Sequence, residues 1–188
     1  HMDILVDLGI SDKETMYIGK IVTYWSAIEN EIFYQCISQY ENSSQIPKEL
    51  KNLQFSSVLK FWKDNIIEKI EDEGVKRNLS TQYEKIELAK NIRDAIVHSF
   101  WEWSSENLSE IKTVRIRKDE LIVLTFTVED LENFFYKVAN IFSNVKFPKG
   151  LIDKLASEIA ENGYSQPSRM MLSKLEKNKI SSDWNIIE

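Results

Sequence analysis

Hydrophobic and polar positions follow a helical period over most of the chain. A capping box at Ser11-Asp12-Lys13-Glu14 precedes apolar residues spaced three or four apart as far as Tyr40, which predicts a first helix of about 30 residues. The same spacing predicts a second helix over about residues 56–74 and a third from about Val75 to Trp103.

The period changes to two between Ile111 and Phe126, where apolar and polar residues alternate on both sides of a polar turn. This pattern predicts a β-hairpin over about residues 111–126. Thr127 to Asp130 then resembles the start of a fourth helix. We therefore expect an all-α bundle with a β-hairpin insertion, formed by one domain over residues 3–162. A short helix and a loose tail over 163–188 follow it.

Composition agrees with a helical protein. The 188 residues include five glycines and three prolines, too few for the many turns of a β-sandwich. The first two residues, His1 and Met2, are typical of a cloning remnant. No apolar run is long enough to span a bilayer, and the single cysteine, Cys36, suits a reducing compartment. We expect a cytoplasmic protein that does not enter membranes.

Several classes of site are excluded by residue counts. Without His1, the chain has one histidine, His98, and with one cysteine it cannot form a Cys/His zinc site. The glycines lie too far apart for a P-loop or a dinucleotide-binding turn. The net charge of −6 provides no general attraction to nucleic acid, so any such contact must be local. We expect no metal and no cofactor, although a carboxylate-only Mg²⁺ site stays open.

The predicted third helix carries a polar stripe. Glu87, Asn91, Asp94 and His98 are spaced four, three and four apart and therefore share one face. Asp94 and His98 stand in an i, i+4 relation, so the carboxylate is expected to reach the imidazole and to fix its tautomer. A stripe of this kind is usually a solvated helix face, and a lone histidine is more often structural than catalytic.

Two charged residues fall on apolar helix faces. Arg93 lies inside the apolar arc of the third helix, and Glu29 lies at the centre of the apolar stripe of the first helix. Charges at such positions are rare unless they are paired. We predict that Glu29 and Arg93 form an ion pair between the two helices. Such pairs are most often architectural, and this alternative stays open.

The segment Arg93-Asp94-Ala95-Ile96-Val97-His98 resembles the R-(polar)-x-x-x-H signature of HEPN domains, which are small helical bundles. The long first helix with an internal acidic residue, and the motif near the end of a later helix, are also similar to that family. The resemblance covers about residues 10–147, and the hairpin looks like an elaboration of it.

The resemblance implies a metal-independent endoribonuclease of a prokaryotic defence or toxin system, which forms a homodimer and can be held by an antitoxin. In those terms Arg93 stabilises charge on the phosphorane, His98 is the general acid or base, and Asp94 orients His98. Glu29 and Asn91 would support them. Some members carry a tyrosine two residues after the histidine, but Phe100 stands there in this chain.

Two other readings remain. Some HEPN domains are inactive dimerisation or binding modules, in which Arg93 and His98 would be structural. A helical scaffold with an accidental match to the motif is the third interpretation. For the catalytic reading, one convex helix face forms no cleft, so we expect a second copy of the helix to complete the site.

Further residues are candidates for RNA contact. Arg115 and Arg117 lie on one face of the first hairpin strand, and Lys118 lies at the turn. Trp101 follows the motif and is a candidate for stacking on bases. A cationic strand face more often protects a sheet edge from aggregation, so this assignment is weaker than the motif itself.

Overall fold

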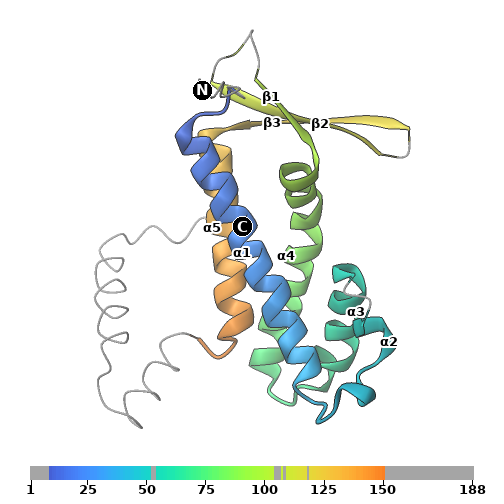
Figure 1. Ribbon diagram of the computed structural model, residues 1–188. Helices are drawn as coiled ribbons and strands as arrows, with labels where there is room; N and C mark the ends of the chain where they lie inside the picture. The colour runs from blue at the N-terminus through green and yellow to red at the C-terminus, as the bar shows by residue number, and fades with distance from the viewer. Residues whose placement is uncertain (1–8, 52–53, 104–106, 108, 118, 151–188) are drawn as a thin grey trace, which may run out of the picture. The chain divides into compact units, whose positions relative to one another are not determined.

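A computed structural model of the chain describes residues 9–51, 54–103, 107, 109–117 and 119–150 (Figure 1). The chain falls into two compact units, residues 1–148 and 149–188, and the fold described here is that of the first unit. The predicted domain boundary at residue 162 and the short helix and loose tail predicted over 163–188 lie outside the described residues and stay predictions.

Helix α1 runs from Asp12 to Ile37, and the predicted capping box opens it, with Glu14 and Ser11 exchanging hydrogen bonds. Its buried residues recur at helical spacing, which places one long apolar stripe against the core. They include Tyr17, Ile21, Trp25, Ile28, Ile32 and Cys36. Glu29 therefore lies on the border of this stripe, and its predicted place at the centre is wrong.

The segment between α1 and the next long helix consists of several short helices and turns. A 3₁₀ turn over Ser43–Gln45 and helix α2 (Lys48–Lys51) lead to helix α3 (Phe55–Asn65) and a second 3₁₀ turn over Ile67–Lys69. The helix predicted to extend to about residue 74 therefore ends early. These pieces bury Leu50, Leu59, Trp62 and Ile67 in the common core.

Helix α4 runs from Glu73 to His98, with the Asp72 carboxylate accepting hydrogen bonds from the first turn. The predicted continuation to Trp103 is wrong. Ser99 has extended backbone angles, and strand β1 (Phe100–Trp103) follows at once. No helix-breaking residue marks this end. Pairing with the next strand supplies the backbone hydrogen bonds, and the aromatic residues of β1 suit a strand.

The predicted hairpin is confirmed and gains a strand. β2 (Glu110–Arg117) and β3 (Glu120–Thr127) pair antiparallel, and β1 pairs with the other side of β2, so the order is β1-β2-β3. Asp119 adopts φ 66° in the turn, a conformation that aspartate tolerates better than most residues.

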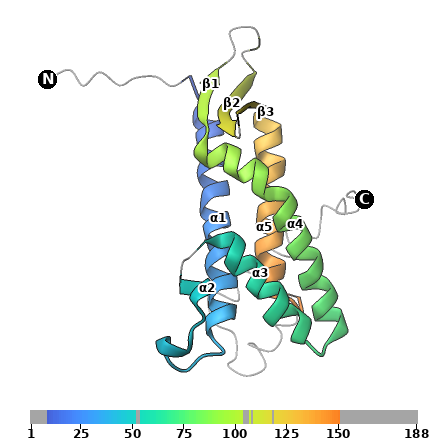
Figure 2. The ribbon, with the colours of Figure 1, turned by 90° about the vertical axis from the view of Figure 1, so that its right-hand side faces the viewer.

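Helix α5 (Val128–Lys146) starts directly after β3, and Thr127 and Asp130 form the predicted capping box. Helices α1, α4 and α5 form the bundle, the sheet lies across one end of it, and α2 and α3 lie toward the other end (Figures 1 and 2). The fold is thus mainly helical with a small antiparallel sheet, which confirms the predicted class at that level. One face of the sheet is turned toward the helix ends and the other away from them.

Candidate functional site at the C-terminal half of α4

The predicted ion pair between Glu29 of α1 and Arg93 of α4 is present. Nη2 of Arg93 lies 2.8 Å from Oε1 of Glu29, and Nη1 of Arg93 lies 3.0 Å from Oδ1 of Asp94. The Arg93 side chain keeps 21% of its surface exposed, so the cluster lies in the α1–α4 seam and still reaches solvent. Two carboxylates thus contact the one guanidinium at the motif's first position.

Trp25 completes this cluster from α1. Its indole Nε1 donates to the same Glu29 oxygen at 2.7 Å, and its ring lies under the guanidinium, 5.5 Å from centroid to Cζ. Nε of Arg93 is buried without a hydrogen-bond partner. Sequence reasoning missed this role of Trp25. The i, i+4 spacing of Trp25 and Glu29 on one helix was the available signal.

His98 is the last residue of α4 and is exposed. The predicted hydrogen bond between Asp94 and His98 is not formed, because the Asp94 carboxylate is engaged by Arg93. Position explains the difference. Arg93 directly precedes Asp94, and its long side chain leaves the seam toward the side where Asp94 lies. The role assigned to Asp94 as the residue that orients His98 therefore does not hold in this structure.

Arg93 and His98 do not point the same way. Five residues on an ideal helix correspond to a rise of about 7.5 Å and a rotation of about 140°. Arg93 is half-buried and turned toward α1, whereas His98 is exposed. The two side chains of one protomer therefore serve different faces of α4.

A shallow groove lies beside α4, and Ile92 is the α4 residue that lines it. Glu87 pairs with Lys90 at 3.6 Å, and Asn91 is exposed beside Ile92. The groove of about 340 Å³ lies between α4, the end of β3 and the first turns of α5. Its lining residues are Ile92, Thr125, Phe126, Asp130, Asn133, Phe134 and Lys137. Sequence reasoning missed Asn133 and Lys137, because nothing local shows which side of α5 faces α4.

The weaker candidates for RNA contact lie in different surroundings. Trp101 is half-buried, packs beside Phe126 at 5.9 Å between ring centroids and donates from Nε1 to the carbonyl of Ile96 at 3.2 Å. These contacts join β1 to α4, and the role of Trp101 as a base-stacking residue stays a prediction. Arg115 is half-buried, and its Nε has no hydrogen-bond partner. The side chains of Arg117 and Lys118 lie outside the described residues.

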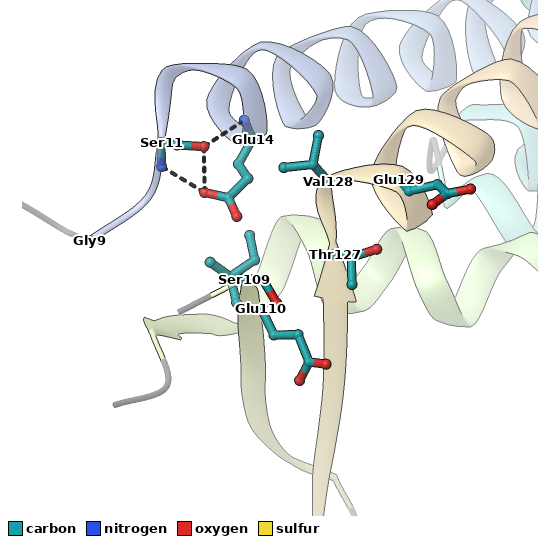
Figure 3. A pocket seen from close by; sticks show the side chains of 9 residues that line it. Gly9, Ser11, Glu14, Ser109, Glu110, Thr127, Val128 and Glu129 are labelled. Atoms are coloured by element: carbon teal, nitrogen blue, oxygen red, sulfur yellow. Dashed lines mark hydrogen bonds between the residues drawn. The ribbon is translucent and has the colours of Figure 1, made fainter. Parts of the chain in front are cut away.

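A larger hollow lies at the other side of the sheet end. It measures about 600 Å³ and is bounded by the beginnings of α1, β2 and α5 (Figure 3). Glu14, Glu110 and Glu129 line it, and the Glu14 side chain forms the capping box of α1. Three carboxylates repel a polyanion. This hollow is therefore a poor site for the phosphates of a nucleic acid.

Other reactive groups are few among the described residues. Burial raises the pKa of the Cys36 thiol to about 12, so Cys36 stays protonated and unreactive near neutral pH. Within the described part of the chain, no three His, Cys, Asp or Glu side chains gather in a way that suits a metal ion. None of the described helices combines the length and the apolar character needed to cross a bilayer.

Comparisons with protein-family models, with curated proteins and with solved structures find no match for this chain.

Proposed function

We propose that the protein is a metal-independent endoribonuclease of the HEPN type, in which Arg93 and His98 act on the RNA backbone. The observation that carries the proposal is a guanidinium held in the α1–α4 seam by Glu29 and Trp25, five residues before an exposed histidine. The seam orients Arg93, because the Glu29 carboxylate and the indole ring hold it from the α1 side. The resemblance of residues 93–98 to the HEPN motif supports the same function.

Asp94 occupies the place on Arg93 that a phosphate would take. A carboxylate oxygen and a phosphate oxygen are both anionic acceptors that fit the guanidinium edge. A substrate phosphate would replace Asp94 on Nη1 while Glu29 keeps Nη2. Arg93 then stabilises the negative charge that develops on phosphorus in the transition state.

The reaction needs a proton acceptor and a proton donor. His98 accepts the proton of the ribose 2′-hydroxyl, the 2′ oxygen attacks phosphorus, and the bond from phosphorus to the 5′ oxygen breaks. The leaving 5′ oxygen takes a proton from water or from His98 of a second copy. The products are a 2′,3′-cyclic phosphate and a 5′-hydroxyl.

The divergence of Arg93 and His98 favours a site shared by two copies. On one helix they are rotated apart by about 140°, so a phosphate on Arg93 is better placed for a histidine from another protomer. A homodimer is therefore part of the proposal, with RNA as substrate. An antitoxin or companion defence protein would be its regulator.

The test is cleavage of a single-stranded RNA by His98→Ala in the presence of EDTA. Removal of a general acid or base costs about 10²–10⁴-fold in rate, whereas the melting temperature of this exposed site should barely change. Leu88→Ala changes another exposed side chain of α4 and is the matched control, expected to retain activity. Undiminished cleavage by His98→Ala, or its loss in EDTA, would contradict the mechanism.

A non-catalytic dimerisation or binding module is the second candidate. It is favoured by the two carboxylates on Arg93 and by the absence of a hydrogen bond between Asp94 and His98. In this case wild-type protein leaves RNA intact over hours. Arg93→Lys, which keeps the charge but loses the planar fork, would then alter stability alone.

A further inference from the structure

The face of the sheet that is turned away from the helices is apolar where it should be polar. An antiparallel sheet with one face on a core normally carries polar residues on the other. Four large apolar side chains are instead exposed on this face, Phe100 at 81%, Ile116 at 76%, Leu121 at 65% and Val123 at 45%. With the half-buried Val114 they form what we call the outer apolar face.

The strand register makes these residues one continuous patch. Phe100 pairs with Val114 and Val114 with Val123, so one row crosses all three strands. Ile116 and Leu121 form the next row toward the hairpin turn. Alternation places the five on the same side. Figures 1 and 2 show the sheet at the end of the bundle, so the helices leave this side uncovered.

We propose that the outer apolar face is a homodimer interface, on which a second copy of this chain docks with the same face. Area supports this occupant. The exposed fractions of the four side chains amount to on the order of 500 Å² of apolar surface, at the upper end of what one patch on a monomer shows. Two copies would bury about twice that, close to the 1,200 Å² of the smaller specific interfaces.

Charge also favours a second copy over other partners. The five residues are uncharged, and the next row holds Glu102 and Lys112, whose charged atoms lie 3.9 Å apart. Two identical faces can therefore meet without net repulsion, although each chain carries −6 overall. RNA or an anionic membrane would require a cationic rim around the outer apolar face. The row of Glu102 and Lys112 offers one cation and one anion, which is no excess of positive charge.

The interface would border the motif. His98 ends α4 only two residues before Phe100, and both side chains are exposed. A copy docked over Phe100 would therefore approach His98. The interface does not depend on ribonuclease activity, and its test measures assembly alone.

The experiment is sedimentation velocity and light scattering of the full chain at micromolar concentrations. We expect a dimer whose dissociation constant rises more than about 100-fold in Leu121→Lys and in Ile116→Lys, because a symmetric dimer carries each change twice. Leu88→Lys is the matched control, since Leu88 is 78% exposed on α4, outside the sheet. It should stay dimeric.

Three results would overturn the proposal. One is a monomeric wild type, which would mean that this face is covered within one chain or is free. Another is a dimer that survives both sheet substitutions. The third is a dimer that is lost only in Leu88→Lys, which would place the interface on α4. Circular dichroism and the melting temperature verify that each variant is folded, and exposed lysines on a strand face are well tolerated.

Discussion

Helix α1 contacts two long helices, and the two contacts differ in chemistry. Against α5 it packs most extensively, and aromatic rings contribute to this contact. Tyr24 meets Phe135 and Phe142 edge-on at 5.3 and 5.9 Å between ring centroids, and Tyr17 lies 6.1 Å from Phe135. Edge-to-face pairs of this kind add to the free energy gained from area burial. The α1–α5 seam is therefore a conventional source of stability.

Against α4, in contrast, α1 contributes a carboxylate and an indole to a guanidinium. The desolvation of a buried ion pair offsets much of its attraction, and apolar residues of similar volume often serve as well or better. Stability alone therefore gives little reason to place Glu29 and Arg93 there. The comparison assigns the fold to the α1–α5 seam and the candidate chemistry to the α1–α4 seam.

The largest effect is expected where the apolar seam is opened. Phe135→Ala removes the ring that contacts Tyr17 and Tyr24 and should lower the free energy of unfolding by about 3 kcal/mol. Tyr136→Ala, its exposed neighbour, is the control and should cost less than about 1 kcal/mol. Urea unfolding measures both. Equal losses of unfolding free energy in the two variants would show that the position of Phe135 in the α1–α5 seam adds no stability.

A smaller effect is expected in the charged seam. Glu29→Gln keeps an oxygen for the Trp25 indole but removes one of the two negative charges on Arg93. A stranded buried charge costs roughly 3–5 kcal/mol, yet Asp94 remains and the cluster reaches solvent, so we expect about 2 kcal/mol.

The double variant Glu29→Leu, Arg93→Leu sharpens the result. It removes both charges and should regain much of the stability lost in Glu29→Gln, although the Trp25 N–H then lacks its acceptor. It should not regain cleavage. A double variant that is less stable than Glu29→Gln would show that the pair is a net source of stability. The contrast between the seams would then fail.

The helices and the Glu29–Arg93 pair could be predicted from the sequence because their signals are local. Capping boxes at Ser11 and Thr127 are set by residues within one turn, and an unpaired charge on an apolar face needs a partner wherever the fold provides one. Each residue of the pair is the simplest partner for the other, because both are charged residues on helix faces with an apolar pattern.

The missed features depend on distant partners. The residues Phe100–Trp103 fit a helical wheel, but pairing with β2 makes them a strand. That same change packs Trp101 against the core and turns Phe100 to solvent. The choice of Asp94 between Arg93 and His98 depends on where the guanidinium emerges from the seam. Local spacing allows Asp94 to contact either Arg93 or His98, and the packing of Arg93 against α1 decides which contact forms.

The smallest expected effect concerns the start of α5, which supports the apolar seam from its end. The side chain and the backbone N–H of Thr127 donate to the Asp130 carboxylate, and these hydrogen bonds hold the pKa of Asp130 below its usual value. A carboxyl with a lower pKa in the folded state stabilises the fold above its unfolded pKa, near 3.9, and loses that contribution as pH falls through the folded value. Asp130→Asn should therefore lower the free energy of unfolding by about 0.5–1 kcal/mol at pH 7, and the difference from wild type should vanish near pH 2. Glu129→Gln removes a neighbouring carboxylate that does not form the capping box. It is therefore the matched control, and its stability should depend less strongly on pH. Thermal unfolding from pH 7 to 2 measures both variants. A constant difference between Asp130→Asn and wild type over this range would mean that the Asp130 charge does not act through the cap.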